Sequence, residues 1–360
     1  MESGRLRVLA LGMYGPLAAS TRYRLSQYVP GLASLGIDVD VRPMLDDDYI
    51  RHRFETGSVS LAQVIRGLAS RAGQLARQNK YDLAWLQCEM VPFLPGRLEA
   101  GMLRIPYVYD VDDAFHVKYS TGRFAKFAPL LGHKFDHVYA RATAVLAGNR
   151  TLCAHARRFN ADCTIVPTVV DHRKYLPRHR SREPGVFNIG WVGSPSSIQC
   201  LKIIERPLME LARETRVRLS VVGGIAPPVE GVEVVNIRWS EDTEIEHIRM
   251  FDVGIMPLHD DPWTRGKCAF KLIQYMASGV PVIASPVGAN VDVVTPDCGI
   301  LAHSAAGWLD AFRTIRDNPD LGDVLGAAGR KKVDEKYSLE GQVPVVADIL
   351  RRAAIGRGRP

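Results

Sequence analysis

Residues 267–290 read KCAFKLIQYMASGVPVIASPVGAN, and this stretch decides the fold class. Apolar residues recur at helical spacing from Phe270 onward, and Gly279 is the residue type that most often ends a helix. The run 281–284 is short and apolar, which is typical of a strand buried in a parallel sheet. A loop of small residues, 285–290, follows it. Because open α/β sheets bind ligands at the carboxyl ends of their strands, the stretch predicts a ligand-binding α/β protein.

Strands and helices alternate along the rest of the chain, which indicates doubly wound parallel sheets and not separate α and β blocks. In the first half we expect strands at Leu6–Leu11, Ile37–Arg42, Leu83–Gln87, Tyr107–Tyr109, Ala144–Leu146 and Thr164–Val166. In the second half we expect strands at Val186–Val192, Val217–Val222, Val232–Val235 and Asp252–Met256. The main predicted helices are Ser20–Ser34, Leu61–Gln78, Phe124–Ala142, Ile198–Glu214 and Leu339–Ala354.

Two domains are expected for a chain of 360 residues, since one hydrophobic core seldom spans so many. Prolines and mixed charges replace periodic apolar residues between Pro167 and Pro184, which is typical of a linker. We therefore predict a Rossmann-like domain over residues 1–170, a second over 171–338, and a helical tail over 339–360. Two such domains place a cleft between them, and clefts between domains are preferred ligand sites.

The composition is that of an ordinary globular protein, with 46% hydrophobic and 24% charged residues. No apolar run is long enough to cross a bilayer or to act as a leader, so we expect a cytoplasmic protein. The six cysteines show no spacing typical of a metal site. The net charge of +7 favours a phosphorylated substrate or an anionic membrane surface as partner. Nucleic acid is disfavoured because the basic residues are scattered, and a basic protein without any such partner stays open.

Residues 271–285, KLIQYMASGVPVIAS, resemble the sugar-nucleotide-binding segment of retaining glycosyltransferases of the GT-B fold, in particular the large family 4 group. The resemblance implies two Rossmann-like doubly wound domains facing across a cleft, with the tail helix packing back on the first. It also implies transfer of a hexosyl group from a UDP- or GDP-sugar to an acceptor hydroxyl, with retention and without a cofactor. The acceptor would be a sugar or a lipid-linked intermediate, in surface polysaccharide or glycoconjugate synthesis at the inner face of the cell membrane.

The donor diphosphate requires cations or backbone N–H groups at a helix start. Arg265, Lys267 and Lys271 supply positive charge in front of Tyr275, where lysines oppose the helix dipole and therefore call for an anion. Family 4 members usually carry two glutamates here, and the second holds the ribose. This chain has Gly266 and Gln274 instead. Gln274 can still hydrogen-bond ribose hydroxyls, so we predict Arg265, Lys267, Lys271 and Gln274 as donor-binding residues.

A second family element is a Gly-Arg pair, followed by a lysine, in the first strand-to-helix loop of the second domain. In the loop 190–199, Gly193 is in place, but Ser194 and Gln199 stand where cations are expected. Hydroxyls and glycine N–H groups can form a neutral nest for a phosphate, so Gly193 and Ser194 join the predicted donor site. A tight turn with an ordinary Ser-Pro helix cap is the alternative.

The first predicted strand ends in Gly12-Met-Tyr-Gly15, whose glycines allow close backbone approach. The family uses this loop near donor phosphate and acceptor, so Gly12 and Gly15 are predicted to bind donor. Arg22 and Arg24 lie two apart and diverge on a helix, so that one reaches the cleft while the other meets solvent. With Glu89, which follows the third strand, they are the predicted acceptor-binding residues.

Asp110, Asp112 and Asp113 follow the fourth strand and lie at the mouth of the predicted cleft. We expect Asp110 or Asp112 to bind the acceptor hydroxyl or to assist as a base. The three acids also resemble a metal-binding DxD, but GT-B transferases as a class generally need no bound metal. His116 completes the catalytic candidates, with a plain loop histidine as the alternative. Asn149 follows the fifth strand, where asparagine is typical of a helix N-cap.

Two other functions stay open. A GT-B sugar-nucleotide epimerase or hydrolase would share the donor site and lack an acceptor. A catalytically silent sugar-nucleotide-binding protein would explain the missing carboxylate pair. A Rossmann dehydrogenase is disfavoured, because the loop at Gly12 and Gly15 does not fit the GxGxxG pattern.

Overall fold

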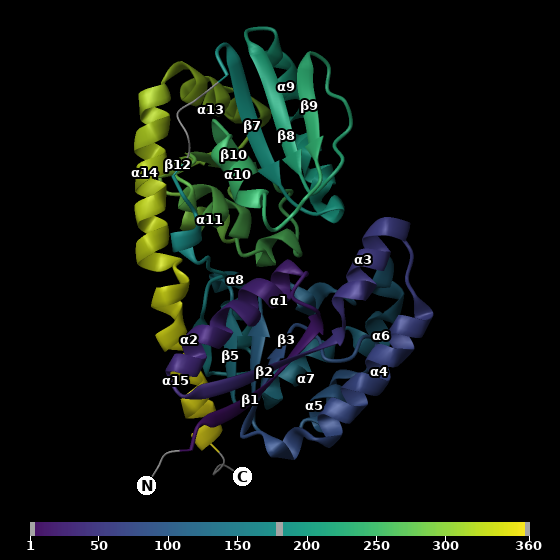
Figure 1. The fold of residues 1–360 in the computed structure, drawn as a ribbon. Helices are drawn as coiled ribbons and strands as arrows, with labels where there is room; N and C mark the ends of the chain where they lie inside the picture. The colour runs from purple at the N-terminus through teal and green to yellow at the C-terminus, as the bar shows by residue number, and fades with distance from the viewer. Residues whose placement is uncertain (1–3, 178–182, 357–360) are drawn as a thin grey trace. The chain divides into compact units, whose positions relative to one another are not determined.

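The computed structural model describes residues 4–177 and 183–356, and the chain divides into two compact units (Figure 1). Unit 1 comprises Met1–Thr168, Gly266–Cys268 and Leu339–Pro360, and unit 2 comprises Val169–Arg265 and Ala269–Ser338. The residues Gly266–Cys268, just before the helix Phe270–Ala277, group with unit 1, although that helix belongs to unit 2. The sequence did not predict this. Residues 178–182 of the predicted linker and 357–360 of the predicted tail lie outside the described residues.

Unit 1 is built on a parallel sheet with the order β2-β1-β3-β4-β5-β6. Its strands are β1 (Leu6–Tyr14), β2 (Ile37–Leu45), β3 (Leu83–Gln87), β4 (Tyr107–Val111), β5 (Ala144–Ala147) and β6 (Cys163–Ile165). Every residue of β3, β4 and β5 is buried, as expected for parallel strands with helices on both faces. The predicted strands of the first half are confirmed, with small differences at their ends.

The helices of unit 1 are α1 (Ala19–Arg24), α2 (Val29–Ser34), α3 (Asp47–Thr56), α4 (Leu61–Ala76), α5 (Gly96–Met102), α6 (Ala128–Leu131), α7 (Lys134–Arg141), α8 (Arg150–Ala156) and α15 (Leu339–Ile355). Two predicted long helices are wrong, because each is broken where a proline starts a new one: Pro30 in the first turn of α2 and Pro129 in the first turn of α6. α3 was not predicted. Among the described residues, none of the helices combines the length and apolar character that a membrane crossing requires.

Unit 2 has a second parallel sheet, with the order β12-β11-β10-β7-β8-β9. Its strands are β7 (Val186–Val192), β8 (Arg216–Val222), β9 (Val232–Ile237), β10 (Val253–Met256), β11 (Val282–Ala284) and β12 (Gly299–Leu301). Its helices are α9 (Glu205–Ala212), α10 (Glu244–Arg249), α11 (Phe270–Ala277), α12 (Asn290–Val293), α13 (Ala305–Asp317) and α14 (Pro319–Lys336). The predicted helix Ile198–Glu214 is instead a 3₁₀ stretch, Pro195–Ile204, followed by α9. Gly279 follows α11 with φ +69°, the left-handed conformation that ends a helix.

The last helix, α15, groups with unit 1 and lies beside α2 (Figure 1). Gly31 of α2 is the point of closest packing, since a Cβ there would lie 2.8 Å from the side chain of Val343. Val346 and Leu350, which lie on α15 as Val343 does, are fully buried. Burial of this apolar side of α15 holds the tail on unit 1.

The centre of unit 2 has no spare volume around β7. Gly190 lies in this strand between β8 and β10, and a Cβ there would lie 1.9 Å from the ring of Phe251. Phe251 is itself buried, so its ring cannot move aside into solvent. Glycine is therefore required at this position for the sheet to pack against the loop that precedes β10.

We expect Gly190→Ala to lower the free energy of unfolding by about 1–3 kcal/mol or more, because the new methyl group overpacks the core. The matched control is Gly73→Ala in α4, where a Cβ would meet nothing within 4 Å. There alanine should stabilise the helix by about 0.5–1 kcal/mol. Urea unfolding midpoints measure both changes. Equal midpoints for Gly190→Ala and the parent would contradict the packing described.

Candidate functional site

Lys271 lies in the first turn of α11 and reaches the loop that follows β7. Its Nζ is 3.4 Å from Oγ of Ser197. The same Nζ lies 4.2 Å from the centre of the Trp191 ring, a cation–π contact. These contacts hold the ammonium group at the carboxyl end of β7, where parallel α/β sheets bind ligands.

Two glycines allow the loops after β7 and β8 to approach each other closely. Gly223 has φ +86°, and a Cβ there would lie 2.4 Å from the carbonyl oxygen of Gly193. A Cβ on Gly193 would lie 2.6 Å from Nζ of Lys271. A side chain at either position would therefore displace the neighbouring backbone or the lysine.

Serine hydroxyls surround the corner that Lys271, Gly193 and Gly223 form. Oγ of Ser194 lies 2.9 Å from Oγ of Ser196, and Ser197 donates its hydroxyl to the carbonyl oxygen of Ser194 at 3.0 Å. Ser194 and Ser196 are exposed, so their hydroxyls can meet a ligand. An ammonium group beside hydroxyls and glycine backbone is chemically suited to phosphate oxygens. Of the predicted donor residues, the structure brings Gly193, Ser194 and Lys271 together here.

The other two predicted cations do not join Lys271 in the first turn of α11. Ala269 precedes this helix in the left-handed conformation, with φ +54°, so the chain turns sharply there. Arg265 forms two hydrogen bonds with Asp260, at 2.5 and 3.0 Å, and both side chains are exposed. Lys267 belongs to unit 1, where its Nζ lies 3.6 Å from Oδ1 of Asp113. The three charges therefore have three different surroundings.

Gln274 lies one turn after Lys271 on α11 and enters a buried polar network. Its amide nitrogen donates to a carboxylate oxygen of Glu244 at 3.0 Å and lies 3.2 Å from the hydroxyl of Tyr175. The other oxygen of Glu244 accepts a hydrogen bond from the indole of Trp239 at 2.9 Å. Gln274 and Glu244 are only 2% and 6% exposed. Sequence reasoning missed Glu244, because nothing in residues 239–244 signals a contact with α11.

This network gives a physical reason for glutamine at position 274. A glutamate there would bring a second carboxylate within about 3 Å of Glu244, and two buried carboxylates cannot both be charged at low cost. Because Glu244 already supplies the acid, an uncharged donor at position 274 is the compatible partner.

We expect Gln274→Glu to destabilise unit 2 in a pH-dependent way. The pair would have a raised pKa in the folded state, so the penalty is absent near about pH 4, where the unfolded chain is protonated as well. It grows as pH rises through the folded pKa and reaches about 1–3 kcal/mol by about pH 8. Urea unfolding across this range measures it, with the exposed Gln199→Glu as control. A penalty of equal size at both ends of the range would contradict the carboxylate pairing.

In unit 1, Asp110 is the penultimate residue of β4 and is buried with Arg24. Nε and NH2 of Arg24 lie 2.9 and 2.8 Å from Oδ1 of Asp110, and the indole of Trp85 donates to Oδ2 at 3.1 Å. Burial raises the pKa of Asp110 to about 6, while the guanidinium group favours the charged form. Both side chains are 1% exposed. We therefore place Arg24 and Asp110 in the framework beneath the edge of the sheet and not among the groups that meet a substrate.

Asp112 lies at the same edge and is partly exposed. Its Oδ1 is 3.3 Å from Sγ of Cys88, and its carbonyl oxygen is 3.0 Å from Sγ of Cys268. Asn149 caps α8, confirming its predicted role, and its side-chain nitrogen donates to the carbonyl oxygens of Gly266 and Lys267 at 2.8 and 3.1 Å. The segment Gly266–Cys268 is thus fixed at the edge that carries Asp112.

His116 lies away from these acids. Its ring stacks on that of His155 in α8, with centroids 3.8 Å apart. Burial lowers the pKa of His116 to about 4, so the imidazole is neutral at pH 7. This packing explains the histidine without a catalytic role.

The loop after β1 is held by protein groups. A guanidinium nitrogen of Arg71 lies 2.5 Å from the carbonyl oxygen of Gly12, and a Cβ on Gly15 would lie 2.3 Å from Oδ1 of Asp47. Arg22 donates to the carbonyl oxygens of Pro16 and Leu17 at 3.2 and 3.3 Å. Gly12 lies within β1, where it pairs with β2, and not in the loop as predicted, whereas Gly15 and Arg22 shape the loop that follows the strand.

Glu89 lies inside unit 1, where its side chain is fully buried and contacts two lysines. Nζ of Lys134 lies 2.6 Å from Glu89 and 2.6 Å from Glu99, and Lys118 and Tyr119 also contact the Glu89 carboxylate. Burial opposes the charge on Glu89, but the two ammonium groups outweigh it and lower the pKa of that carboxyl. A carboxylate enclosed in this way cannot meet an acceptor, so we do not retain Glu89 as an acceptor-binding residue.

We expect Lys134→Met to lower the free energy of unfolding by about 3–5 kcal/mol at neutral pH, because it leaves two buried carboxylates without their shared cation. The control is the exposed Lys126→Met, which should change stability by less than about 0.5 kcal/mol. Chemical unfolding measures both. If Lys134→Met kept full stability and impaired only the use of an acceptor, Glu89 would have to be returned to the acceptor site.

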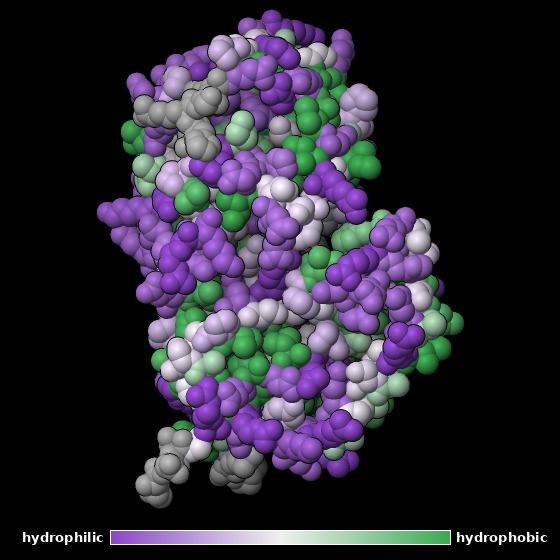
Figure 2. All heavy atoms as spheres, viewed as in Figure 1, coloured by the Kyte–Doolittle hydropathy of each residue, from purple (hydrophilic) through white to green (hydrophobic). Residues whose placement is uncertain are grey.

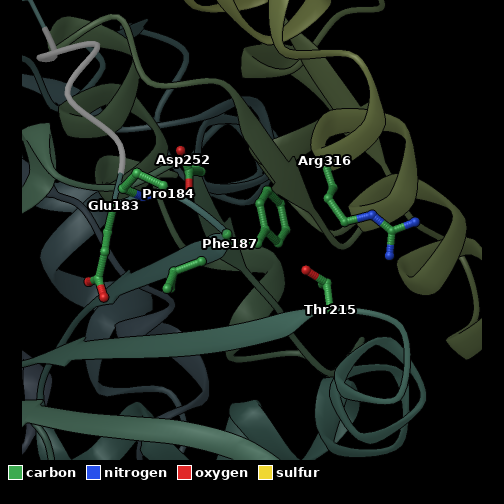
Figure 3. Close-up of a pocket in the computed structure, with 8 residues that line it drawn as sticks. Glu183, Pro184, Phe187, Thr215, Asp252 and Arg316 are labelled. Carbon is green, nitrogen blue, oxygen red and sulfur yellow. The ribbon is translucent and has the colours of Figure 1, made fainter.

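A surface hollow in unit 2 lies at the other edge of its sheet. Phe187 and Thr215 line it near the amino ends of β7 and β8, together with Glu183, Asp252 and Arg316. Figure 3 shows Thr215 and Arg316 on one side and Glu183 on the other. Since parallel sheets bind ligands at their carboxyl ends, we do not assign this hollow to the donor. Within 4–177 and 183–356, no cluster of three or more His, Cys, Asp or Glu is arranged to hold a metal ion.

Comparison with known proteins completes the description. Residues 186–318 match the model of the family described as glycosyl transferases group 1. A search of curated proteins finds no significant match.

Many solved structures share the fold across nearly the whole chain. Sucrose-phosphate synthase from Thermosynechococcus elongatus aligns with 17% identity and a TM-score of 0.72, over 97% of this chain and 99% of that one. Anabaena HepE, solved in complex with UDP-glucose, aligns with 13% identity and a TM-score of 0.71, over 96% and 100%. WaaG, a glycosyltransferase involved in lipopolysaccharide biosynthesis, aligns with 17% identity and a TM-score of 0.65, over 96% and 99%. The architecture is the GT-B fold.

Proposed function

We propose, from the match of residues 186–318 to the model of the glycosyl transferases group 1 family, that this protein transfers a hexosyl group from a nucleoside diphosphate sugar to an acceptor hydroxyl with retention. The observation that carries the proposal is the corner formed by Lys271, Gly193 and Ser194. It lies at the carboxyl ends of β7 and β8, inside the segment that matches the family.

The donor diphosphate fits this corner by charge. As the glycosidic bond to the diphosphate breaks, negative charge builds on the phosphate oxygens. The ammonium group of Lys271, held against Trp191, and the hydroxyls beside it would stabilise that charge. Ser197 and Trp191 fix the position of the lysine through contacts within the protein, so little reorganisation would be needed when the donor binds. The UDP-glucose in the HepE complex supports uridine as the base to test first.

The ribose is proposed to lie toward Gln274. Lys271 and Gln274 are three residues apart on α11 and therefore share one face of the helix. The hydrogen bond from Gln274 to Glu244 fixes the amide and brings a carboxylate to this region. This pair would take the place of the ribose-binding glutamate that the family usually carries.

The acceptor is proposed to meet the carboxyl edge of the unit 1 sheet. With Asp110 neutralised by Arg24, the acids available there are Asp112 and Asp113, the latter beside Lys267. Asp112 is partly exposed and is our candidate for orienting the acceptor hydroxyl. A sugar or a lipid-linked intermediate on the cytoplasmic side of a membrane is the proposed acceptor, in surface polysaccharide or glycoconjugate synthesis.

A silent sugar-nucleotide-binding protein is the second candidate, and Gly266 is the observation that favours it. A Cβ at this position would lie 2.6 Å from the backbone nitrogen and the Cβ of Ala114, so the first family glutamate has no counterpart and no space. Binding of donor without turnover would identify this case. Slow donor turnover without an acceptor would identify an epimerase or hydrolase.

We expect Lys271→Ala to weaken binding of UDP by about tenfold or more, because it removes the ammonium group that faces the phosphates. Isothermal titration with UDP, GDP and dTDP, without added metal, measures the effect and identifies the base. The control is Lys331→Ala on α14, whose side chain is 78% exposed and which should bind as the parent does.

Equal affinity for UDP in Lys271→Ala and the parent would remove Lys271 from the donor site. Failure of the parent to bind any of the three nucleotides would overturn the proposed function. If UDP binds, incubation with UDP-sugars and a panel of acceptors separates transfer from the silent and hydrolytic alternatives.

A further inference from the structure

Unit 1 exposes a group of large apolar side chains in one short part of the chain. Phe54 at the end of α3, Val59 in the connecting loop and Leu61, Ile65 and Leu68 in α4 are 67%, 61%, 70%, 58% and 41% exposed. Single exposed apolar residues are common on protein surfaces, but five within residues 54–68 form a patch that requires an explanation. In Figure 2, green surface adjoins purple over the part of unit 1 that carries α3 and α4.

The apolar side of α4 is wider than the part that unit 1 covers. Its buried residues include Gly67 and Leu75, and a Cβ on Gly67 would lie 2.6 Å from the carbonyl oxygen of Met44 in β2. Leu61, Ile65 and Leu68 follow one another at i, i+4 and i+7, which places them in one stripe of the helix next to that buried face. The exposed stripe is therefore a continuous surface of α4 and not scattered side chains.

Positive charge accompanies this stripe. Residues 61–80 contain four lysines and arginines and no acidic residue, whereas residues 46–56 contain four acidic residues against two arginines, so the positive charge belongs to α4 and the segment after it. Arg53, Arg66, Arg77 and Lys80 are exposed, whereas Arg71 is turned inward. An amphipathic helix with an exposed apolar stripe and basic flanks is the pattern that binds at the surface of anionic membranes.

We propose that the face formed by Phe54, Val59, Leu61, Ile65 and Leu68, with its flanking arginines, docks this protein onto an anionic lipid bilayer. The apolar side chains enter the headgroup region, and the basic residues contact lipid phosphates. A second copy of the chain is a poorer occupant, because a two-fold contact through this face would bring its arginines against their own equivalents. The proposal does not depend on glycosyl transfer, although a lipid-linked acceptor would be reached from such a surface.

The test is co-sedimentation of the full chain with vesicles of phosphatidylcholine, with and without about 30% phosphatidylglycerol. We expect the parent to bind the anionic vesicles, and to bind less as salt is raised to about 0.5 M. Leu61→Ser/Ile65→Ser/Leu68→Ser and Arg53→Glu/Arg66→Glu should each lower this binding by about tenfold or more. The matched control is Val324→Ser on α14, a residue that is 64% exposed, which should leave binding unchanged.

Several results of the vesicle experiment would contradict docking on an anionic bilayer. Failure of the parent to bind anionic vesicles, equal binding to neutral vesicles, or equal binding by all variants would overturn the proposal. If the serine variant changed the molecular mass measured by light scattering, the face would be a contact between copies of the chain. Unfolding midpoints check that the variants fold. Titration with UDP keeps the two proposals apart, because these variants should bind the nucleotide as the parent does.

Discussion

Parallel strands bring their carboxyl ends to one edge of a sheet, and every charge buried there must find a partner. This constraint shapes both units. In unit 1, Asp110 at the end of β4 is neutralised by Arg24, and Glu89, just beyond β3, by Lys134. In unit 2, the buried carboxylate of Glu244 takes hydrogen bonds from Gln274 and from an indole. Because Asp110 and Glu89 are already satisfied by the protein, they set the geometry of the unit 1 edge and leave substrate contacts to their more exposed neighbours. In unit 2, the hydrogen bond to Glu244 instead fixes the Gln274 amide, beside which the ribose is proposed to lie.

The same constraint decides which acids can act on an acceptor. A carboxylate that orients a hydroxyl must be reachable, and Asp110 is not. Asp112 lies two residues further along, where the strand has ended and the side chain is partly exposed. Segment Gly266–Cys268, anchored by Asn149, adds Lys267 to this edge. Burial raises the pKa of Asp113 to about 6, and the nearby positive charge of Lys267 opposes this shift.

Local sequence patterns predicted every strand except β12, together with α11 and the helix end at Gly279, because apolar periodicity and helix stops act over a few residues. The helix breaks at Pro30 and Pro129 were missed, since proline in the first turn of a new helix preserves the apolar spacing. The grouping of Gly193, Ser194 and Lys271 could be anticipated, because a strand-to-helix loop and the start of a helix meet at the carboxyl edge of a parallel sheet, and donor binding by these residues stays a prediction. Glu244 could not, because its contact with Gln274 joins residues thirty positions apart. The burial of Arg24 and Glu89 likewise depends on partners distant in sequence.

The net charge of +7 does not show where the basic residues lie, and their positions bear differently on the two proposals, donor binding and membrane attachment. A basic chain can be read as one that binds a phosphorylated substrate, but the proposed donor corner contains a single lysine, hydroxyls and backbone. A run of basic residues without any acidic neighbour instead lies between residues 61 and 80, beside an apolar stripe that unit 1 leaves exposed. A fixed corner can bind a diphosphate with one well-placed ammonium group, because its geometry is already set. A membrane surface offers no fixed geometry, so attachment to it would depend on the number of basic residues and on apolar area, and α4 carries both.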